Sequence, residues 1–313
     1  MRYFTHRLGQ ALLVLWAAFT VSFVLLQVLP GDAILIKFQN PDLGLSPQQI
    51  QAMREAYGAA TPLWEQYVHT LGAILRGDFG YSVQAGVPVS ELLAENLPAT
   101  LRLALPGFLL AVIWAVLIAF ASNLVGLRWL RNALQTLPSL FVSIPTFWLG
   151  IALIQIFSFR LGWIPVIDPG KWVGMILPVI TLSVPISAPL AQILIRSLDQ
   201  VALQPFVAVA RSKGASYRRV LFHHVARNAA LPTLTIAGLL FGEVLAGALI
   251  TETVFGLSGL GALTQQAVNN QDVAVLQSIV ILSATAFVFI NLFVDLISLA
   301  LDPRLKAVQR AVP

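Results

Sequence analysis

Long apolar segments dominate this sequence and restrict the folds that it can adopt. Six of them, at about 8–29, 100–124, 133–159, 173–197, 231–254 and 277–301, are long enough to cross a bilayer as helices. The hydrocarbon core of a bilayer is about 30 Å thick and takes about 20 helical residues. Lipid offers no hydrogen bonds to the backbone, so such segments span as helices. The sequence therefore predicts an all-α integral membrane protein with six transmembrane helices.

The low content of charged residues supports this interpretation. Only 11% of the residues are charged and 58% are hydrophobic, with a mean hydropathy of +0.82, whereas about a quarter of the residues of a soluble protein are charged. The net charge of +5 does not indicate nucleic-acid binding, because no basic stripe interleaved with aromatic residues lies outside the presumed cytoplasmic loops. The chain has no cysteine, which excludes disulfides, iron–sulfur clusters and thiol catalysis.

Apolar and polar stretches divide the chain into four parts. Residues 1–29 hold the N-terminus and the first transmembrane helix, 30–99 an extracytoplasmic loop domain, 100–301 the transmembrane core, and 302–313 a cytoplasmic tail. A cleaved signal peptide is the alternative for the first apolar run. That run is longer than the apolar region of a signal peptide, which spans about 7–15 residues, and we therefore expect a membrane helix.

The loop domain is expected to hold two short helices. Ser46 offers an N-cap with Gln49 three residues later, the pattern of a capping box, and Gly58 is expected to end this helix. The second helix is expected to start at Thr61-Pro62 and to end at about 76–77, with an apolar face between.

The distribution of Lys and Arg predicts the orientation of the chain. Thirteen of the nineteen basic residues fall at the N-terminus, in the loop near residues 128–131, at 196–227 and in the tail. The other side holds six, together with most of the acidic residues. Cytoplasmic loops carry the excess of Lys and Arg, so both termini are predicted to be cytoplasmic.

Residues 204–232 form a basic island between two apolar segments. They contain five Lys or Arg and no acidic residue, and their apolar residues recur at helical spacing. Gly214 divides the stretch, which predicts two short helices joined by a sharp turn. One interpretation is a loop that merely follows the positive-inside rule. The other is a docking surface for a partner.

The order of residues within this island favours the docking surface. The run from Ala208 to Ser216, followed by Arg227-Asn228-Ala229 and Leu231-Pro232, resembles the EAA loop of ATP-binding-cassette importer permeases of the dipeptide, oligopeptide and nickel branch. The glutamate that names the motif is replaced by Ala208, as is common in that branch. Further stretches at 77–101, 242–261 and 291–304 resemble the same branch, so that the resemblance covers nearly the whole chain. Residues 270–275 depart from its pattern, which leaves the shape of that outer loop open.

The resemblance implies a permease subunit in the bacterial inner membrane. Its loop at 204–232 would form the coupling helix that docks on an ATPase, and its partners would be a second homologous permease, two ATPase subunits and an extracytoplasmic solute-binding protein. ATP and Mg would be bound by the ATPases and no cofactor by this chain. The cargo would be a short peptide or, alternatively, nickel or another chelated metal. The residues to which the resemblance assigns ATPase coupling are Ala208, Ala210, Arg211, Ser212, Lys213, Gly214, Ala215, Ser216, Arg218 and Arg219.

Catalytic motifs are missing from the sequence. It contains no Gly-x-x-x-x-Gly-Lys-Ser/Thr loop to hold ATP, so hydrolysis is expected of another chain. The sequence also lacks His-Glu-x-x-His, and the adjacent His223 and His224 point about 100° apart on a helix, which makes a poor metal site. We therefore expect no catalytic or metal-binding residue.

Two carboxylates, Glu243 and Asp295, fall within predicted spans. A charge in the bilayer costs at least about 2.5–3.5 kcal/mol and normally faces protein or water. Pairing between helices and contact with the substrate along a pathway are both compatible with this position.

A secondary carrier or channel driven by an ion gradient is the main alternative function. Six helices are few for a carrier, and the sequence shows neither the internal repeat nor the dense relay carboxylates of such proteins.

Overall fold

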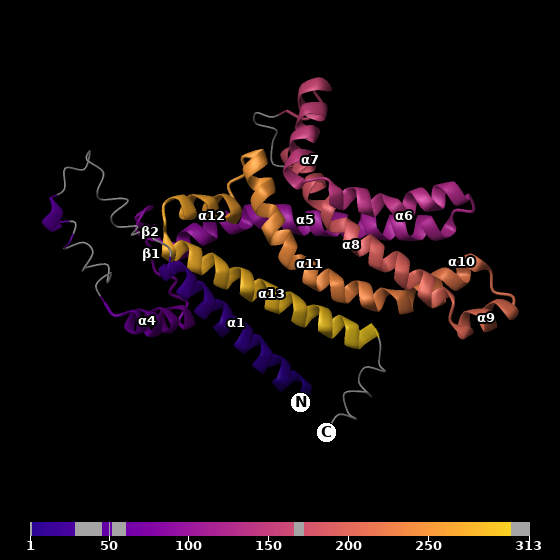
Figure 1. Cartoon of the computed structure of the whole chain (residues 1–313), viewed down its shortest axis with the longest axis horizontal. Helices are drawn as coiled ribbons and strands as arrows, with labels where there is room; N and C mark the ends of the chain where they lie inside the picture. Colours follow the sequence, from indigo (N-terminus) through magenta and orange to yellow (C-terminus); the bar gives the residue numbers. More distant parts are fainter. Residues whose placement is uncertain (1, 29–45, 50, 52–60, 166–171, 302–313) are drawn as a thin grey trace. The chain divides into compact units, whose positions relative to one another are not determined.

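The computed structural model describes residues 2–28, 46–49, 51, 61–165 and 172–301 of the 313-residue chain (Figure 1). These residues are predominantly helical and form two compact units. The first unit combines Met1–Thr100 with Leu257–Val288, and the second combines Leu101–Gly256 with Phe289–Pro313.

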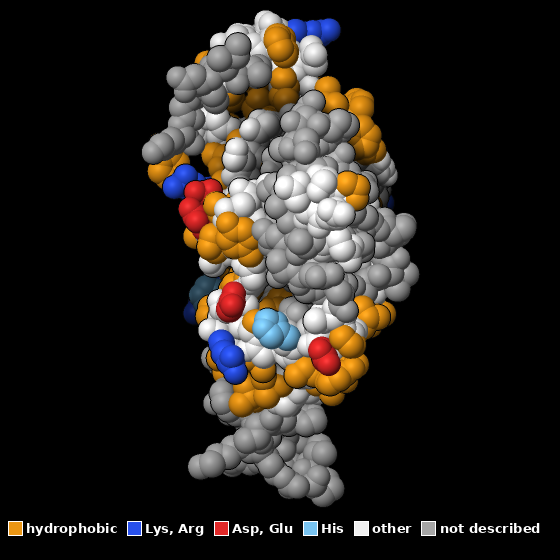
Figure 2. All heavy atoms as spheres, turned by 90° about the vertical axis from the view of Figure 1, so that its left-hand side faces the viewer, with side chains coloured by type: hydrophobic (Ala, Val, Ile, Leu, Met, Phe, Trp, Pro, Cys, Tyr) orange, Lys and Arg blue, Asp and Glu red, His pale blue; other side chains and the backbone are white. Residues whose placement is uncertain are grey.

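Five helices are long and apolar enough to cross a membrane, which agrees with five of the six predicted spans. They are α1 (Arg2–Val28), α5 (Val89–Leu124), α8 (Ile176–Ala202), α11 (Ala226–Phe255) and α13 (Val273–Leu301). In the end view of Figure 2, hydrophobic side chains form separate patches and charged side chains are few among the described residues. The long helices themselves expose large apolar side chains, such as Leu13 of α1, Leu109 of α5 and Phe293 of α13, as a surface in contact with lipid requires.

The remaining span is not one continuous helix, as predicted for 133–159, but a bent pair. Helix α6 (Arg128–Ser143) is followed by α7 (Thr146–Leu153), which continues into the π-helical turn Ile154–Arg160, and the two parts meet at 98°. Ile144 at the bend is extended, with φ −90° and ψ 117°, and precedes Pro145. A residue before proline is driven out of the helical region by the proline ring, so the break follows from the sequence.

Two further features of the first unit differ from the prediction. Helix α5 begins at Val89 and not near residue 100, because Val89 and Leu93 of its first turns are buried in an apolar cluster. Helix α12 (Leu260–Asn269) was not predicted, and its Leu260, Leu263 and Ala267 belong to the same cluster. Helix α5 therefore starts within the stretch 30–99, and its first turns pack with a second segment of the chain.

Both predicted short helices of the loop domain begin as expected. Ser46 and Gln49 form a reciprocal capping box, in which the Ser46 amide donates to Gln49 Oε1 at 2.8 Å and the Gln49 amide to Ser46 Oγ at 3.3 Å. The predicted end of this helix at Gly58 lies outside the described residues. Helix α4 (Leu63–Leu75) follows Pro62, and its Tyr67 ring packs on Phe19 of α1 with ring centroids 5.2 Å apart.

A small hairpin is joined to the start of α13 within the first unit. Strands β1 (Tyr81–Ser82) and β2 (Val87–Pro88) pair in antiparallel fashion, with Ser82 opposite Val87. The buried Ser82 hydroxyl donates to the Asp272 carboxylate at 2.5 Å, and the Val275 amide donates to the other oxygen of that carboxylate at 3.4 Å. Asp272 thus caps α13 and holds the hairpin, which defines the loop at 270–275.

Replacing Asp272 with alanine is expected to loosen this hairpin. The change removes an N-cap, at about 0.5–2 kcal/mol, and leaves the Ser82 hydroxyl buried without its acceptor, at about 1–3 kcal/mol. The melting temperature of the protein in detergent and the rate of protease cleavage at residues 81–88 measure the effect. Asp78→Ala is the control, because Asp78 is exposed and accepts the amide of Gly80, two residues away in the same loop. Equal melting temperatures for the two variants would contradict the capping role.

Small residues allow three helices of the second unit to approach closely. A Cβ atom on Gly107 of α5 would lie 2.8 Å from Leu182 of α8, and one on Gly247 of α11 would lie 2.9 Å from the same side chain. Leu182 is 1% exposed. Membrane helices associate through such small-residue contacts because lipid supplies no hydrophobic drive between them. Helices α5, α8 and α11 therefore form one packed body.

Candidate coupling surface

The basic island forms the helix–turn–helix that the sequence predicts. Helix α9 (Pro205–Ser212) is followed by α10 (Tyr217–Val220), which runs on through the π-helical turn Leu221–Val225 into α11. Pro205 occupies the first position of α9, where its missing N–H costs nothing. Ser216 caps α10 by accepting the Arg219 amide at 3.4 Å. We call residues 204–225 the coupling surface.

Gly214 makes the turn between the two helices. Its φ is +85°, a left-handed conformation that glycine adopts without strain. The Gly214 amide donates to the Arg211 carbonyl at 2.9 Å, and the Ala215 amide donates to the Ala210 carbonyl at 3.2 Å. These two bonds define a Schellman motif, the usual way in which a helix ends at glycine.

Four buried residues anchor the coupling surface to the body of the second unit. Val207, Val220, Leu221 and Val225 are between 1% and 7% exposed and share an apolar cluster with the ends of α5 and α8, including Leu198. Burying each such side chain stabilises the contact by about 1.5–3 kcal/mol. The coupling surface is therefore firmly attached to the membrane helices.

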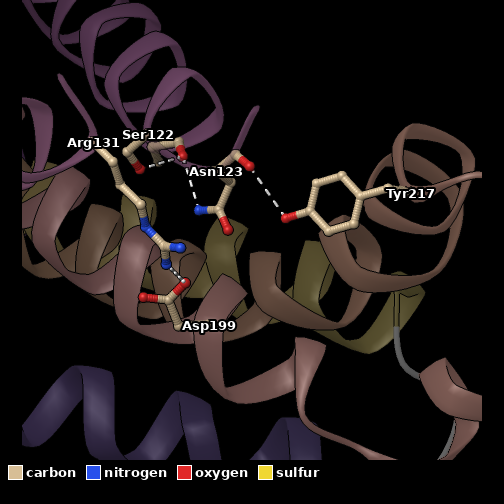
Figure 3. A network of polar contacts seen from close by, with 6 residues as sticks. Ser122, Asn123, Arg131, Asp199 and Tyr217 are labelled. Carbon is tan, nitrogen blue, oxygen red and sulfur yellow. Dashed lines mark hydrogen bonds and ion pairs between the residues drawn. The ribbon is translucent and has the colours of Figure 1, made fainter. Parts of the chain in front are cut away.

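Two aromatic residues tie the coupling surface to the end of α5. The Tyr217 hydroxyl donates to the backbone carbonyl of Asn123 at 3.2 Å (Figure 3), and Phe222 stacks on Phe120 with ring centroids 5.1 Å apart. Asn123 lies in the last turn of α5, where carbonyl groups have no partner within the helix. Tyr217 supplies the missing donor.

A salt bridge beside this contact joins two neighbouring helices. Arg131 of α6 lies 3.3 Å from the Asp199 carboxylate of α8 (Figure 3). Both side chains are more than 40% exposed, and exposed pairs contribute at most about 1 kcal/mol. The pair orients α6 and α8 more than it stabilises them.

The outward face of the coupling surface is basic. Of the ten residues predicted there, Ala210 and Ala215 are half-buried and pack against the apolar cluster. The other eight are exposed: Ala208, Arg211, Ser212, Lys213, Gly214, Ser216, Arg218 and Arg219. His223, His224 and Arg227 extend this face. It can therefore receive an acidic partner over a surface that carries no competing carboxylate in residues 204–232.

Sequence reasoning missed Tyr217 and Phe222. The available signal was their size, since the island otherwise consists largely of small, aliphatic and basic residues. Their partners Asn123 and Phe120 are about a hundred residues away in sequence, and only the fold brings them together.

The ionisable residues of the spans lie in different surroundings. Glu243 is exposed on α11 and Asp295 is half-buried on α13. The fully buried carboxylate is Glu252, which the sequence did not single out. No group of three or more metal-ligating side chains occurs in the described part of the chain, and His223 and His224 are both exposed.

Sequence comparison places nearly the whole chain in one family. Residues 107–307 match the binding-protein-dependent transport system inner membrane component, and residues 1–104 match the N-terminal part of the same component. The chain belongs to this family. Its members are multi-span membrane permeases that carry out transport and not catalysis, and they work with ATPases and a binding protein.

Individual relatives resemble this permease over its full length. A probable peptide ABC transporter permease of Sinorhizobium fredii is 35% identical over 97% of the chain and 99% of the relative. A glutathione transport system permease of Escherichia coli is 32% identical over 98% of the chain and 99% of the relative. Among solved structures, an inward-facing MetNI methionine ABC transporter matches with a TM-score of 0.56 at 16% identity, over 67% of this permease and 96% of that chain. That likeness concerns the fold alone.

Proposed function

We propose that this permease passes short peptides across the bacterial inner membrane as part of an ATP-driven importer. The observation that carries the proposal is similarity over the whole length to permeases for peptides and for glutathione, itself a short peptide. Nickel as the cargo is suggested only by the resemblance to the dipeptide, oligopeptide and nickel branch, and neither of the two relatives described above is a nickel permease.

The assembly would contain a second homologous permease, two ATPase subunits and an external solute-binding protein. ATP and Mg would be bound by the ATPases, since this chain lacks a phosphate-binding loop. The coupling surface would sit in a groove of one ATPase, where Arg211, Lys213, Arg218 and Arg219 face acidic side chains. Complementary charge fixes the register of such a contact and excludes wrong partners.

The anchoring of the coupling surface suggests how ATP binding moves the membrane helices. A shift of the docked ATPase would displace α9 and α10, and the buried contacts of Val220 and Leu221 would carry this displacement to α5 and α8. Tightly packed elements move as rigid bodies and do not deform continuously. The pathway would turn from inward-facing to outward-facing.

Replacing Tyr217 with phenylalanine is expected to weaken this transmission. The ring remains, but the hydrogen bond to Asn123, worth about 0.5–1.5 kcal/mol, is lost. We expect normal expression and more ATP hydrolysed per peptide transported, measured in proteoliposomes. Tyr81→Phe is the control, because Tyr81 also donates to a backbone carbonyl but lies in the hairpin. Coupling ratios that do not differ between the two variants would exclude this role of Tyr217.

The proposed orientation has both termini and the coupling surface in the cytoplasm. The absence of cysteine makes a single introduced thiol an unambiguous reporter. A cysteine at the exposed Gln51 is expected to react with an impermeant maleimide in cells with a permeabilised outer membrane, and one at Ser216 only after lysis. The experiment uses cells without the ATPase subunits, which would otherwise cover Ser216. Labelling of Ser216→Cys before lysis would overturn the orientation.

Uptake by a deletion strain tests the choice of cargo. The strain carrying this gene on a plasmid is expected to accumulate labelled di- or oligopeptides, and the strain without it to lose this uptake while nickel uptake is unchanged. Loss of nickel uptake with normal peptide uptake would contradict the proposal.

A further inference from the structure

One face of α11 is left uncovered along the whole helix. From Asn228 to Thr253, the exposed residues of the helix recur three or four positions apart and so form a single stripe. They are Asn228, Pro232, Thr235, Leu239, Glu243, Ala246, Ile250 and Thr253. A face toward lipid would be uniformly apolar, whereas this stripe carries a carboxylate in its middle.

Glu243 lies deep in the membrane. It is thirteen residues from Gly256, the left-handed glycine that ends α11, and at 1.5 Å per residue this places it about 20 Å along the helix. The apolar core of a bilayer is about 30 Å thick. A carboxylate at this depth faces water or a counter-charge and not lipid.

The other polar groups of the stripe bond to backbone carbonyl groups one turn earlier in the chain. Asn228 Nδ2 donates to the His224 carbonyl at 2.7 Å. Thr235 Oγ1 donates to the Leu231 carbonyl at 3.3 Å, and Thr253 Oγ1 donates to the Leu249 carbonyl at 2.9 Å. Within the described residues, Glu243 makes no hydrogen bond or ion pair. Pairing between helices of this chain, one of the two interpretations open from the sequence, therefore does not account for Glu243.

We infer that Glu243 lines the transport pathway and binds the terminal ammonium group of the passing peptide. This inference rests on the proposed peptide transport. Every unblocked peptide carries that positive group whatever its side chains, so one carboxylate serves many sequences. A charge-assisted hydrogen bond between ammonium and carboxylate is about twice as strong as a neutral one, and it offsets the cost of bringing either charge into the membrane.

The test compares one peptide with its analogue in which hydrogen replaces the amino group. Uptake of both is measured in proteoliposomes holding the complete importer, with Glu243 intact, with Glu243→Gln and with Glu243→Asp. The ratio of the two uptake rates is the readout. If the binding protein binds one of the two peptides more tightly, this preference is the same for all three permeases. It therefore cancels when the uptake ratios of the three permeases are compared.

We expect Glu243→Gln to reduce the preference for the amino peptide by about tenfold, which corresponds to about 1.4 kcal/mol, and Glu243→Asp to retain most of it. Stimulation of ATP hydrolysis by the binding protein should persist in both. An unchanged ratio with Glu243→Gln would overturn the inference, and so would loss of the second permease on purification of this variant, which would show that Glu243 pairs with that subunit. Failure of the unchanged permease to transport either peptide would instead refute the proposed function.

Discussion

Replacing Gly214 with valine is expected to abolish transport while leaving expression and membrane insertion intact. Valine at a φ of +85° places a β-branched side chain in the left-handed region, at a cost of order 1–2 kcal/mol. Apart from its two chain neighbours, no atom of the described residues lies within 4 Å of the Cβ position, so the fold can tolerate the change. The turn between α9 and α10 would shift, and valine would meet the docked ATPase.

A glycine with the same backbone conformation provides the control. Gly77 has a φ of +82° and, among the described residues other than its chain neighbours, also has no atom within 4 Å of its Cβ position, but it lies far from the coupling surface in sequence, after α4. Gly77→Val is therefore expected to carry a similar strain and to transport normally. Peptide uptake and recovery of the ATPase subunits on purification measure both variants. Near-normal uptake with Gly214→Val, or an equal loss with Gly77→Val, would remove the coupling role from this stretch.

Reversing two charges of the coupling surface is expected to separate the ATPase subunits from the permease. Arg218 and Arg219 are exposed and lie at the start of α10, where glutamate would face the acidic groove proposed for the partner. Like charges opposed across an interface cost several kcal/mol, and each 1.4 kcal/mol is tenfold in affinity. Arg218→Glu combined with Arg219→Glu should therefore purify without ATPase.

The salt dependence of ATPase binding provides a second measurement of the same contact. Salt screens exposed charges, with a Debye length of about 8 Å at physiological ionic strength, so binding to the unchanged permease should weaken as salt rises. Arg128→Glu reverses a charge at the start of α6, outside the coupling surface, and is expected to retain the ATPase. Retention of ATPase by the double variant, or loss of ATPase with Arg128→Glu, would contradict docking at 204–225.

The spans and the turn at Gly214 could be predicted because their causes are local. Apolar length identifies a membrane helix, and a glycine after a short amphipathic helix indicates its end. The bend at Pro145 also has a local cause. Because the apolar run continues through it, apolar length alone does not show that the span is bent. Helix α12 was not predicted because it is short, and its apolar residues are buried by contacts with distant residues such as Val89 and Val275.

The contacts that give the candidate site its mechanical role depend on the fold. The apolar spacing of the island includes Ala210, but it did not indicate that Ala215, in the turn, also packs inward. The sequence also could not predict the hydrogen bond between Tyr217 and Asn123, because a contact between residues distant in sequence produces no periodic pattern. The same holds for carboxylates, because hydropathy shows that Glu243 and Glu252 lie in one helix but not that only Glu252 is buried.

ATP-dependent uptake in proteoliposomes tests the central claim most directly. Labelled peptide and purified binding protein are placed outside vesicles that hold this permease, its second permease and the ATPases, with ATP and Mg inside. We predict uptake that requires every component and stops when Gly214→Val replaces the unchanged chain. Uptake by this permease alone, without ATPase or ATP and driven by an imposed ion gradient, would contradict the account.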